Sequence, residues 1–270
     1  MKGRGMSESP DARSAPERFV EWMTAHEHID RKNELTYHYH PRSDAHSVAL
    51  SRFIAADLVR MTPALGDALQ AGRIVCGINV PFAGKDGRLK TLDLAFGEDF
   101  PALPATIDLD ALATAKSLSR VILSCEAKSV MTEHSKSQPR VYDELSSSHE
   151  IIHQADPKAL AAGVVVVNIA AEFVSPTRQS RGQPVSVTQH KQPHATARMI
   201  SHLRGLPIRS AARTVGFDAF AIIVVECDNV GPAGLWTEFP APQPGDPDHY
   251  MSFVSRLSLA LEAKLRGTGD

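Results

Sequence analysis

The feature that most constrains the fold is a nearly unbroken apolar run, GVVVVNI, at residues 163–169. A strand buried on both faces of a sheet has a continuous run of apolar, β-branched residues, whereas a half-exposed strand alternates between apolar and polar. A second run of this kind, AFAIIVVE, occupies residues 219–226. Both runs therefore predict strands in the interior of a layered protein.

Helices and a hairpin are expected around these strands. Apolar residues at helical spacing predict a helix over residues 43–70, broken at Pro63. Two β-rich segments flank the turn signal Asp86-Gly87 and predict a hairpin. The segments that follow are predicted as a short helix at 108–116, a strand at 120–128 and helices at 132–154, 195–205 and 250–265. This order predicts an α/β domain with a mixed sheet flanked by helices.

The length of 270 residues is sufficient for one large domain with a substantial core. Residues 1–15 are rich in Pro, Ser, Gly and charge and are expected to form a mobile leader. We expect residues 16–270 to form a single domain, with a core at about 43–170 and a C-terminal extension at 171–270.

Composition limits the class of protein. No stretch has the apolar length of a transmembrane span, and no apolar segment of a secretory signal is visible near the start. Three cysteines without CxxC spacing indicate buried free thiols in a reducing compartment, so a cytoplasmic protein is expected. The formal net charge of -2 argues against coating nucleic acid by bulk charge, although an enzyme can confine such contacts to one cleft.

The tripeptide Glu-Ala-Lys occurs twice, and its context distinguishes the two copies. The copy at residues 262–264 lies in a helical pattern, where side chains two apart point to different sides and cannot share a site. The first copy ends a predicted strand, so its Glu126 and Lys128 project from the same face. Such a pair at a strand end is either a structural ion pair or part of a chemical site.

A further acid, Asp93, lies inside the apolar returning strand of the hairpin. Ionised Asp is depleted from strand interiors and is rarely buried without a partner. If this strand neighbours that of Glu126, two carboxylates and the Lys128 ammonium meet, and a divalent cation relieves the repulsion between the acids. Oxygen ligands of this kind suit Mg²⁺ or Mn²⁺. Asp108 and Asp110 compete with Asp93 for this role, but their position before an Ala-rich helical pattern favours helix capping.

This arrangement resembles the PD-(D/E)xK nuclease superfamily, which includes many restriction endonucleases and anti-phage effector nucleases. The resemblance covers roughly residues 43–170 and consists of a helix, a hairpin carrying Asp93, a strand carrying Glu126-Ala127-Lys128, and a further helix. Leu92 stands where the name of the superfamily has Pro.

The resemblance implies a restriction-endonuclease-like core and metal-dependent hydrolysis of phosphodiester bonds. Asp93, Glu126 and the backbone carbonyl of Ala127 would hold Mg²⁺, for which Mn²⁺ would be able to substitute. Lys128 would orient or deprotonate the attacking water and help to neutralise the phosphate. A metal polarises the phosphoryl oxygen, and a positioned cation stabilises charge in the transition state.

Three interpretations of function remain open. A type II restriction endonuclease would be a homodimer or higher homo-oligomer that cuts both strands of double-stranded DNA, with the polar loop at residues 175–194 contacting bases. A phage-defence effector nuclease would cut with little sequence preference, gated by a small-molecule activator or by assembly. A non-catalytic protein would retain the fold and use the charged residues as an ion-pair network.

Basic residues outside the acid cluster are the predicted DNA contacts. Lys136 and Arg140 lie one turn apart on the helix predicted at 132–154, where the alternative is a solvated face with an Arg140–Glu144 pair. The polar loop adds further basic side chains, namely Arg178, Arg181 and Lys191.

Two weaker candidates concern metal ligation. Asp44 and His46, at the start of the first predicted helix, could reach the metal site. His190 and His194 have the spacing of a zinc pair, but Pro193 interrupts the helix between them and no third ligand is evident.

Overall fold

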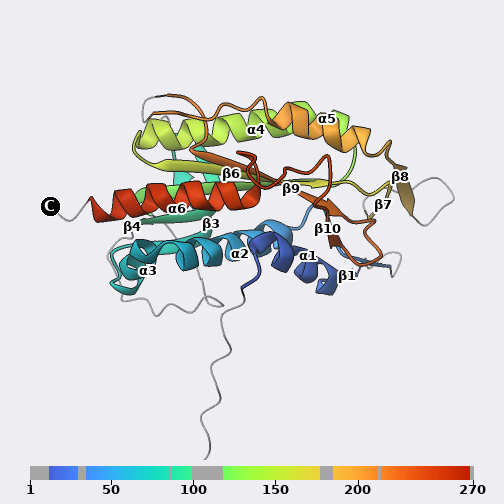
Figure 1. Cartoon of the computed structure of the whole chain (residues 1–270), viewed down its shortest axis with the longest axis horizontal. Coiled ribbons are helices and arrows are strands. Elements are labelled where there is room, and N and C mark those ends of the chain that lie inside the picture. The colour runs from blue at the N-terminus through green and yellow to red at the C-terminus, as the bar shows by residue number, and fades with distance from the viewer. Residues whose placement is uncertain are drawn as a thin grey trace, which may run out of the picture.

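A computed structural model describes residues 12–29, 35–85, 87–98, 118–176, 185–211 and 214–267. In chain order the elements are α1 (Ala15–Ala25), β1 (His28–Ile29), β2 (Thr36–Tyr37), α2 (Ala45–Met61), α3 (Pro63–Gln70), β3 (Val75–Ala83), β4 (Leu89–Glu98), β5 (Arg120–Val130), α4 (His134–Ala155), β6 (Leu160–Asn168), β7 (Glu172–Ser175), β8 (Ser186–Gln189), α5 (His194–Leu203), β9 (Ala219–Glu226), β10 (Gly234–Leu235) and α6 (Tyr250–Arg266). A six-stranded sheet lies between two helical layers (Figure 1).

The central sheet is mixed, as the sequence predicted. Its strand order is β10-β9-β6-β5-β4-β3, with β5, β6 and β9 parallel and the remaining pairs antiparallel. The apolar run at 163–169 forms most of β6, which is buried over its whole length. The run at 219–226 forms β9, in which only Glu226 is exposed. Continuous apolar sequence therefore corresponds to the strands in the middle of the sheet.

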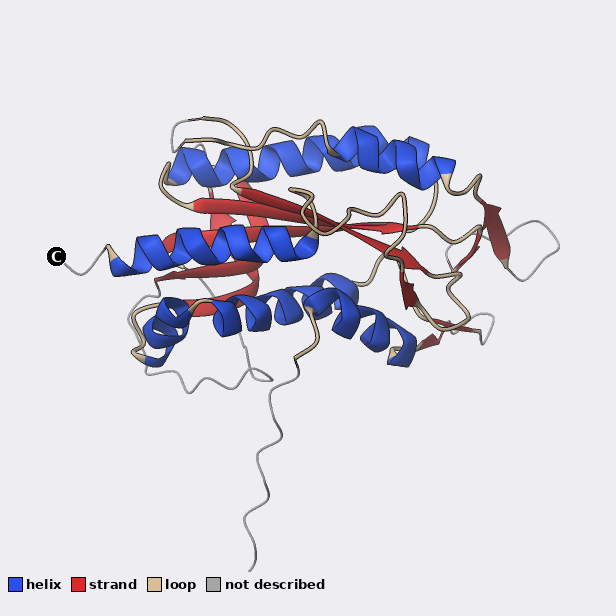
Figure 2. Ribbon diagram, in the orientation of Figure 1, coloured by secondary structure: helices blue, strands red, loops and turns tan. Residues whose placement is uncertain are grey.

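Helices cover both faces of this sheet. Figure 2 shows α4 and α5 on one side and α1, α2, α3 and α6 on the other. Val164 and Val166 belong to the apolar cluster under α2 and α6, whereas Val165 and Val167 belong to the cluster under α4 and α5. Burial of each such side chain contributes about 1.5–3 kcal/mol. None of the described helices is long and apolar enough to cross a membrane.

Helix α1 was not predicted, and it is held by a buried carboxylate. Ser14 caps the helix in a capping box with Glu17. Asp57, which is 1% exposed, accepts hydrogen bonds from the Ala15 backbone N–H at 2.7 Å and the Tyr250 hydroxyl at 2.8 Å. It also pairs with Arg18 at 2.7 Å. One acid therefore joins α1, α2 and α6, and its several donors offset the cost of burying its charge.

Most predicted elements are confirmed with small shifts of their ends. Pro63 begins α3, as its missing N–H favours. Pro139 lies in the second turn of α4, close to the start of that helix. The cysteines at 76, 125 and 227 are buried free thiols. The leader was predicted at residues 1–15, and its end is wrong, because Ser14 caps α1 and the buried Ala15 begins that helix. Residues 1–11 and the short helix predicted at 108–116 lie outside the described residues.

The prediction of one long loop at residues 175–194 is wrong in part. Ser186–Gln189 forms β8, which pairs antiparallel with β7 in a two-stranded sheet. Its side chains alternate between exposed and half-buried, and a short strand of this kind has too few apolar residues to be recognised from sequence. Residues 177–184 lie outside the described part of the chain.

Candidate metal and catalytic site

Strands β4 and β5 separate at the level of Asp93 and Glu126. The β4–β5 ladder ends at the pair Leu94–Cys125. Beyond this pair, among the described residues, β4 pairs only with β3, and β5 only with β6. The sheet therefore forks, and backbone groups along the inner edges of the fork need partners other than the neighbouring strand.

The hairpin is rotated at Asp93. Leu94 packs in the cluster under α2 and α6, but Leu92, two residues earlier, packs in the cluster under α4 and α5. Residues two apart in a regular strand share a face, so the strand turns over between them. Asn79, opposite Asp93 in the register of the hairpin, has φ 55°. This irregularity directs the Asp93 carboxylate across the fork.

The first contact across the fork is a hydrogen bond between Asp93 and Ala127. The backbone N–H of Ala127 donates to Asp93 Oδ2 at 2.8 Å. Ala127 is the central residue of the first Glu-Ala-Lys copy, so this bond brings the hairpin acid to Glu126 and Lys128. The structure thus assembles the three charged residues that the sequence predicted to meet.

Two lysines hold the Glu126 carboxylate, which is 4% exposed. Lys128 Nζ lies 2.6 Å from Oε1, and Lys90 Nζ lies 3.1 Å from Oε2. Lys90 also donates to Ser148 Oγ at 2.6 Å, and Lys128 lies 3.6 Å from Glu144. The site therefore faces α4, and Lys90 is a member that sequence reasoning missed. The sequence feature that could have identified Lys90 is strand alternation, which places it two residues from buried Leu92 and on the same face.

The electrostatics of the site follow from burial and from the closeness of the acids. Burial and the neighbouring charge of Glu126 raise the pKa of Asp93 to about 6, against the opposing effects of the Ala127 N–H, Lys128 and Lys90. Burial lowers the pKa of Lys128, but Glu126 outweighs this effect, so that the pKa is raised overall and the ammonium is retained. Two carboxyl groups and two ammonium groups thus share one partly buried site.

The donor set is suited to a hard divalent cation. Within the described ranges, no group of three or more His, Cys, Asp or Glu is placed to hold a metal ion. The fork instead offers two carboxylates, and Mg²⁺ typically takes one or two from a protein and retains several waters. The pKa of Asp93 is raised first by burial and then by the charge of Glu126, and a cation would relieve the repulsion between the two acids. Asp93, Glu126 and the Ala127 carbonyl therefore fit Mg²⁺ in type and number.

The remaining predicted residues have mixed outcomes. Arg140 pairs with Glu144 at 3.5 Å. This is the ion pair expected if that side of the helix is a solvated face and not a DNA contact. Lys136 pairs with Glu133 at 2.7 Å, and Lys191 is exposed. The other predicted contacts and rival acids lie outside the described residues: Arg178, Arg181, Asp108 and Asp110.

The two residues at the start of α2 differ in their relation to the fork. Asp44 accepts a hydrogen bond from Asn79 Nδ2 at 3.0 Å and so lies beside the hairpin at the level of Asp93. The His46 ring instead packs against Trp22 and Tyr39, with centroids 5.2 and 4.6 Å away. Asp44 is thus the nearer of the two predicted auxiliary residues, and His46 belongs to an aromatic cluster.

The second Glu-Ala-Lys copy makes no comparable site. Glu262 accepts from the Ala64 backbone N–H at 3.3 Å and pairs with Arg266 at 3.2 Å. Lys264 donates to the backbone carbonyl of Lys158. The two side chains point to different neighbours, as the helical spacing predicted.

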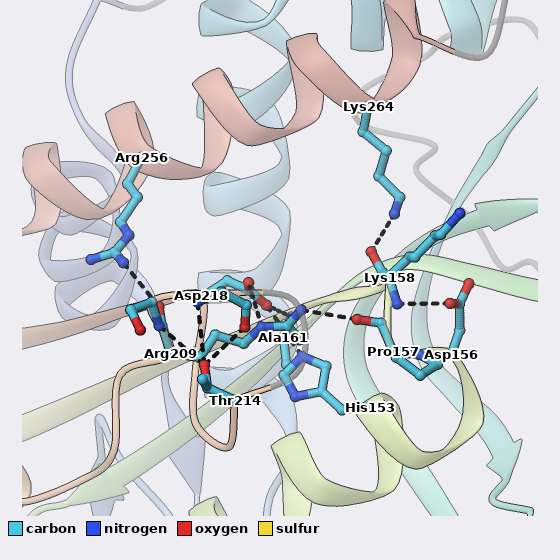
Figure 3. A network of polar contacts seen from close by, with 12 residues as sticks. His153, Asp156, Pro157, Lys158, Ala161, Arg209, Thr214, Asp218, Arg256 and Lys264 are labelled. Atoms are coloured by element: carbon cyan, nitrogen blue, oxygen red, sulfur yellow. Dashed lines mark hydrogen bonds and ion pairs between the residues drawn. The ribbon is translucent and has the colours of Figure 1, made fainter.

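A second polar network lies where β6 and β9 begin, at the ends of these strands away from the fork (Figure 3). Asp218 accepts from the Ala161 backbone N–H at 2.8 Å and pairs with Arg209 at 3.3 Å and His153 at 3.2 Å. Arg209 also donates to the Pro157 carbonyl at 2.9 Å. With one carboxylate at its centre, this network joins α4, β6 and the segment before β9 and is structural in character.

The fold and the fork together define an α/β protein with two acids and two lysines at a split between neighbouring strands of a mixed sheet. Comparisons of the chain with family models, with curated proteins and with solved structures found no match. The class of reaction must therefore be inferred from the side chains of the site.

Proposed function

We propose that the chain is a Mg²⁺-dependent endonuclease that hydrolyses phosphodiester bonds of double-stranded DNA, with a restriction-endonuclease-like core. The observation that carries the proposal is the hydrogen bond from the Ala127 N–H to Asp93 Oδ2. This bond brings an acid of the hairpin to the strand that already carries Glu126 and Lys128.

Each side chain has a role in the proposed reaction. Asp93, Glu126 and the Ala127 carbonyl would bind the cation, which supplies polarisation of the phosphoryl oxygen and a bound water of lowered pKa. Lys128 would orient the attacking water and stabilise charge on the phosphate. Lys90 pairs with the other oxygen of Glu126, so it would compete with the cation for that carboxylate and give up this pair when the cation binds.

The proposed cellular setting follows from the same chemistry. Cutting both strands of a duplex at a palindrome needs two sites, so a restriction endonuclease would act as a homodimer or higher homo-oligomer in the cytoplasm. A phage-defence effector would use the same site under the control of a small-molecule activator or of assembly.

A non-catalytic protein is the second candidate, and one observation favours it. Both oxygens of Glu126 are paired with lysines, at 2.6 and 3.1 Å, which completes an ion-pair network without a metal. Breaking a buried pair of this kind costs about 3–5 kcal/mol, so such a network can be retained for structure alone.

Plasmid cleavage separates these candidates. Supercoiled DNA is incubated with Mg²⁺ and wild type, Asp93→Asn, Lys128→Ala or the control Lys264→Ala, which alters the second Glu-Ala-Lys copy. We expect wild type and Lys264→Ala to nick and linearise the plasmid, and both site variants to lose at least about 100-fold in rate. Discrete bands would favour a restriction enzyme and a smear an effector nuclease. Equal rates of cleavage by all four proteins would remove the proposed site, and no cleavage by any of them would support the non-catalytic candidate.

A further inference from the structure

A cavity of about 390 Å³ lies beside the start of α4 and is separate from the residues of the fork. Its walls come from the first turn of α4, from β8 and the segment after it, and from the start of α5. Because α4 follows β5, the cavity lies at the carboxyl ends of the parallel strands, where α/β proteins usually bind ligands. Its volume is within the range of about 300–1,000 Å³ that is typical of small-molecule sites.

The charges around this cavity favour an anion. Lys136, Lys191 and Arg198 contribute three cations, and Glu133, which pairs with Lys136, contributes one carboxylate. Lys191 and Arg198 are exposed, and no ion pair with another described residue is recorded for either. The first turn of α4, a helix of 22 residues, has no side-chain cap at its N-terminus. The positive end of the helix dipole adds to the attraction for an anion.

A buried histidine in the wall adds an independent requirement. His134 is 2% exposed, and its Nε2 lies 2.7 Å from the carbonyl oxygen of Asn168. Because a carbonyl only accepts, Nε2 carries the proton and Nδ1 is left as an acceptor. Burial lowers the pKa of His134 to about 4, so the ring is neutral at pH 7. Within the described part of the chain, Nδ1 has no hydrogen-bond partner.

A ligand for this cavity must therefore satisfy two conditions. It needs an anionic group for the basic side chains and the helix N-terminus, and it needs a hydrogen-bond donor for His134 Nδ1. A nucleotide meets both, since it carries a phosphate together with sugar hydroxyls or base amines. A simple carboxylate meets only the first condition, whereas a nucleotide supplies the anion and the donor from separate groups.

We propose that this cavity is a nucleotide-binding site, with the phosphate at Lys191 and Arg198 and a hydroxyl or amine donating to His134 Nδ1. The nucleotide is either a free molecule or one unit of a DNA strand that continues from the fork. The site does not depend on the proposed nuclease activity, because it uses none of the fork residues.

The test measures binding without divalent cations and with the full-length Lys128→Ala protein, so that a failure of nuclease activity does not affect it. Isothermal titration uses adenosine 5′-monophosphate, adenosine, and a 12-nucleotide single-stranded DNA. The double variant Lys191→Ala/Arg198→Ala is compared with Arg52→Ala/Arg73→Ala, which removes two exposed cations remote from the cavity. A third measurement follows the nitrogen NMR signal of His134 Nδ1.

We expect the monophosphate or the DNA to bind, with adenosine at least about tenfold weaker, because charge-assisted hydrogen bonds to phosphate are the strong ones. The cavity variant should lose at least about tenfold in affinity and the control variant none, and the Nδ1 signal should shift on saturation. Binding of DNA alone would identify the strand as the source of the nucleotide. No binding of either ligand at millimolar concentration, equal losses in both double variants, or an unchanged Nδ1 signal would overturn the proposal.

Discussion

Asp93 and Ala127 are joined across the fork between β4 and β5 by a hydrogen bond of 2.8 Å. The bond takes the place of a strand–strand contact beyond the last ladder pair, Leu94–Cys125, and joins the residue one past Leu94 to the residue two past Cys125. It fixes one carboxylate beside another while leaving the second oxygen of Asp93 for other partners. The proposed metal chemistry depends on this relationship.

Asp93 is expected to make stability depend on pH. Its pKa is raised from 3.8 to about 6 in the folded chain, so the folded state binds more protons than the unfolded state between these values. The free energy of unfolding should therefore fall as the pH rises from about 4 to 6. Asp93→Asn removes this dependence and should be more stable than wild type at pH 7.5 by on the order of 2 kcal/mol. Urea unfolding of wild type and Asp93→Asn at pH 4.5 and 7.5 measures the free energies. If the two proteins differ in free energy of unfolding by the same amount at both pH values, the prediction is refuted.

Mg²⁺ is expected to stabilise the folded protein through the same two acids. At ten times its dissociation constant, a ligand that binds only the folded state adds about 1.4 kcal/mol, which for a chain of this size raises the Tm by about 2–4 °C. Thermal scans with and without Mg²⁺ should show this rise in wild type and in the control Glu262→Gln. The rise in Tm should be absent from Asp93→Asn and Glu126→Gln. If both variants show the same rise as wild type, the metal binds elsewhere.

Lys90 is expected to compete with the cation for Glu126. Its ammonium lies 3.1 Å from Oε2, so removing it frees that oxygen and leaves the acids less neutralised. Lys90→Met should therefore bind Mg²⁺ more tightly, by about threefold to tenfold, as the loss of one partly exposed ion pair suggests. Calorimetric titration with MgCl₂ measures the change. Weaker binding by this variant would mean that Lys90 supports the metal site.

The network around Asp218 is expected to hold the fold without affecting the reaction (Figure 3). Asp218→Ala leaves Arg209, whose side chain is 5% exposed, without its carboxylate, and the free energy of unfolding should fall by about 3 kcal/mol. Urea unfolding measures the loss, and plasmid cleavage at 25 °C should be unchanged. A stable variant that no longer cuts DNA would assign this network to the active site.

The parts of the fold that were predicted from sequence are those with strong periodicity. The continuous apolar runs gave β6 and β9. An acid inside an apolar strand, Asp93, and the same-face spacing of Glu126 and Lys128 predicted a shared site only on the condition that the two strands are neighbours, which the pairing of β4 with β5 fulfils. The role of Lys90 was not predicted because its partner Ser148 lies on α4, and that contact depends on how α4 packs on the sheet. Helix α1 was not predicted because its 11 residues follow a polar segment, and Asp57, which holds it, is distant in sequence.

The most direct test of the central claim is the position of a bound cation. A crystal grown with MnCl₂ gives an anomalous signal at the metal. We expect one peak in the fork, within about 2.0–2.3 Å of oxygens from both Asp93 and Glu126, with Lys90 displaced from Oε2. A fork in which Lys90 and Lys128 still hold Glu126 while manganese binds elsewhere, or not at all, would contradict it.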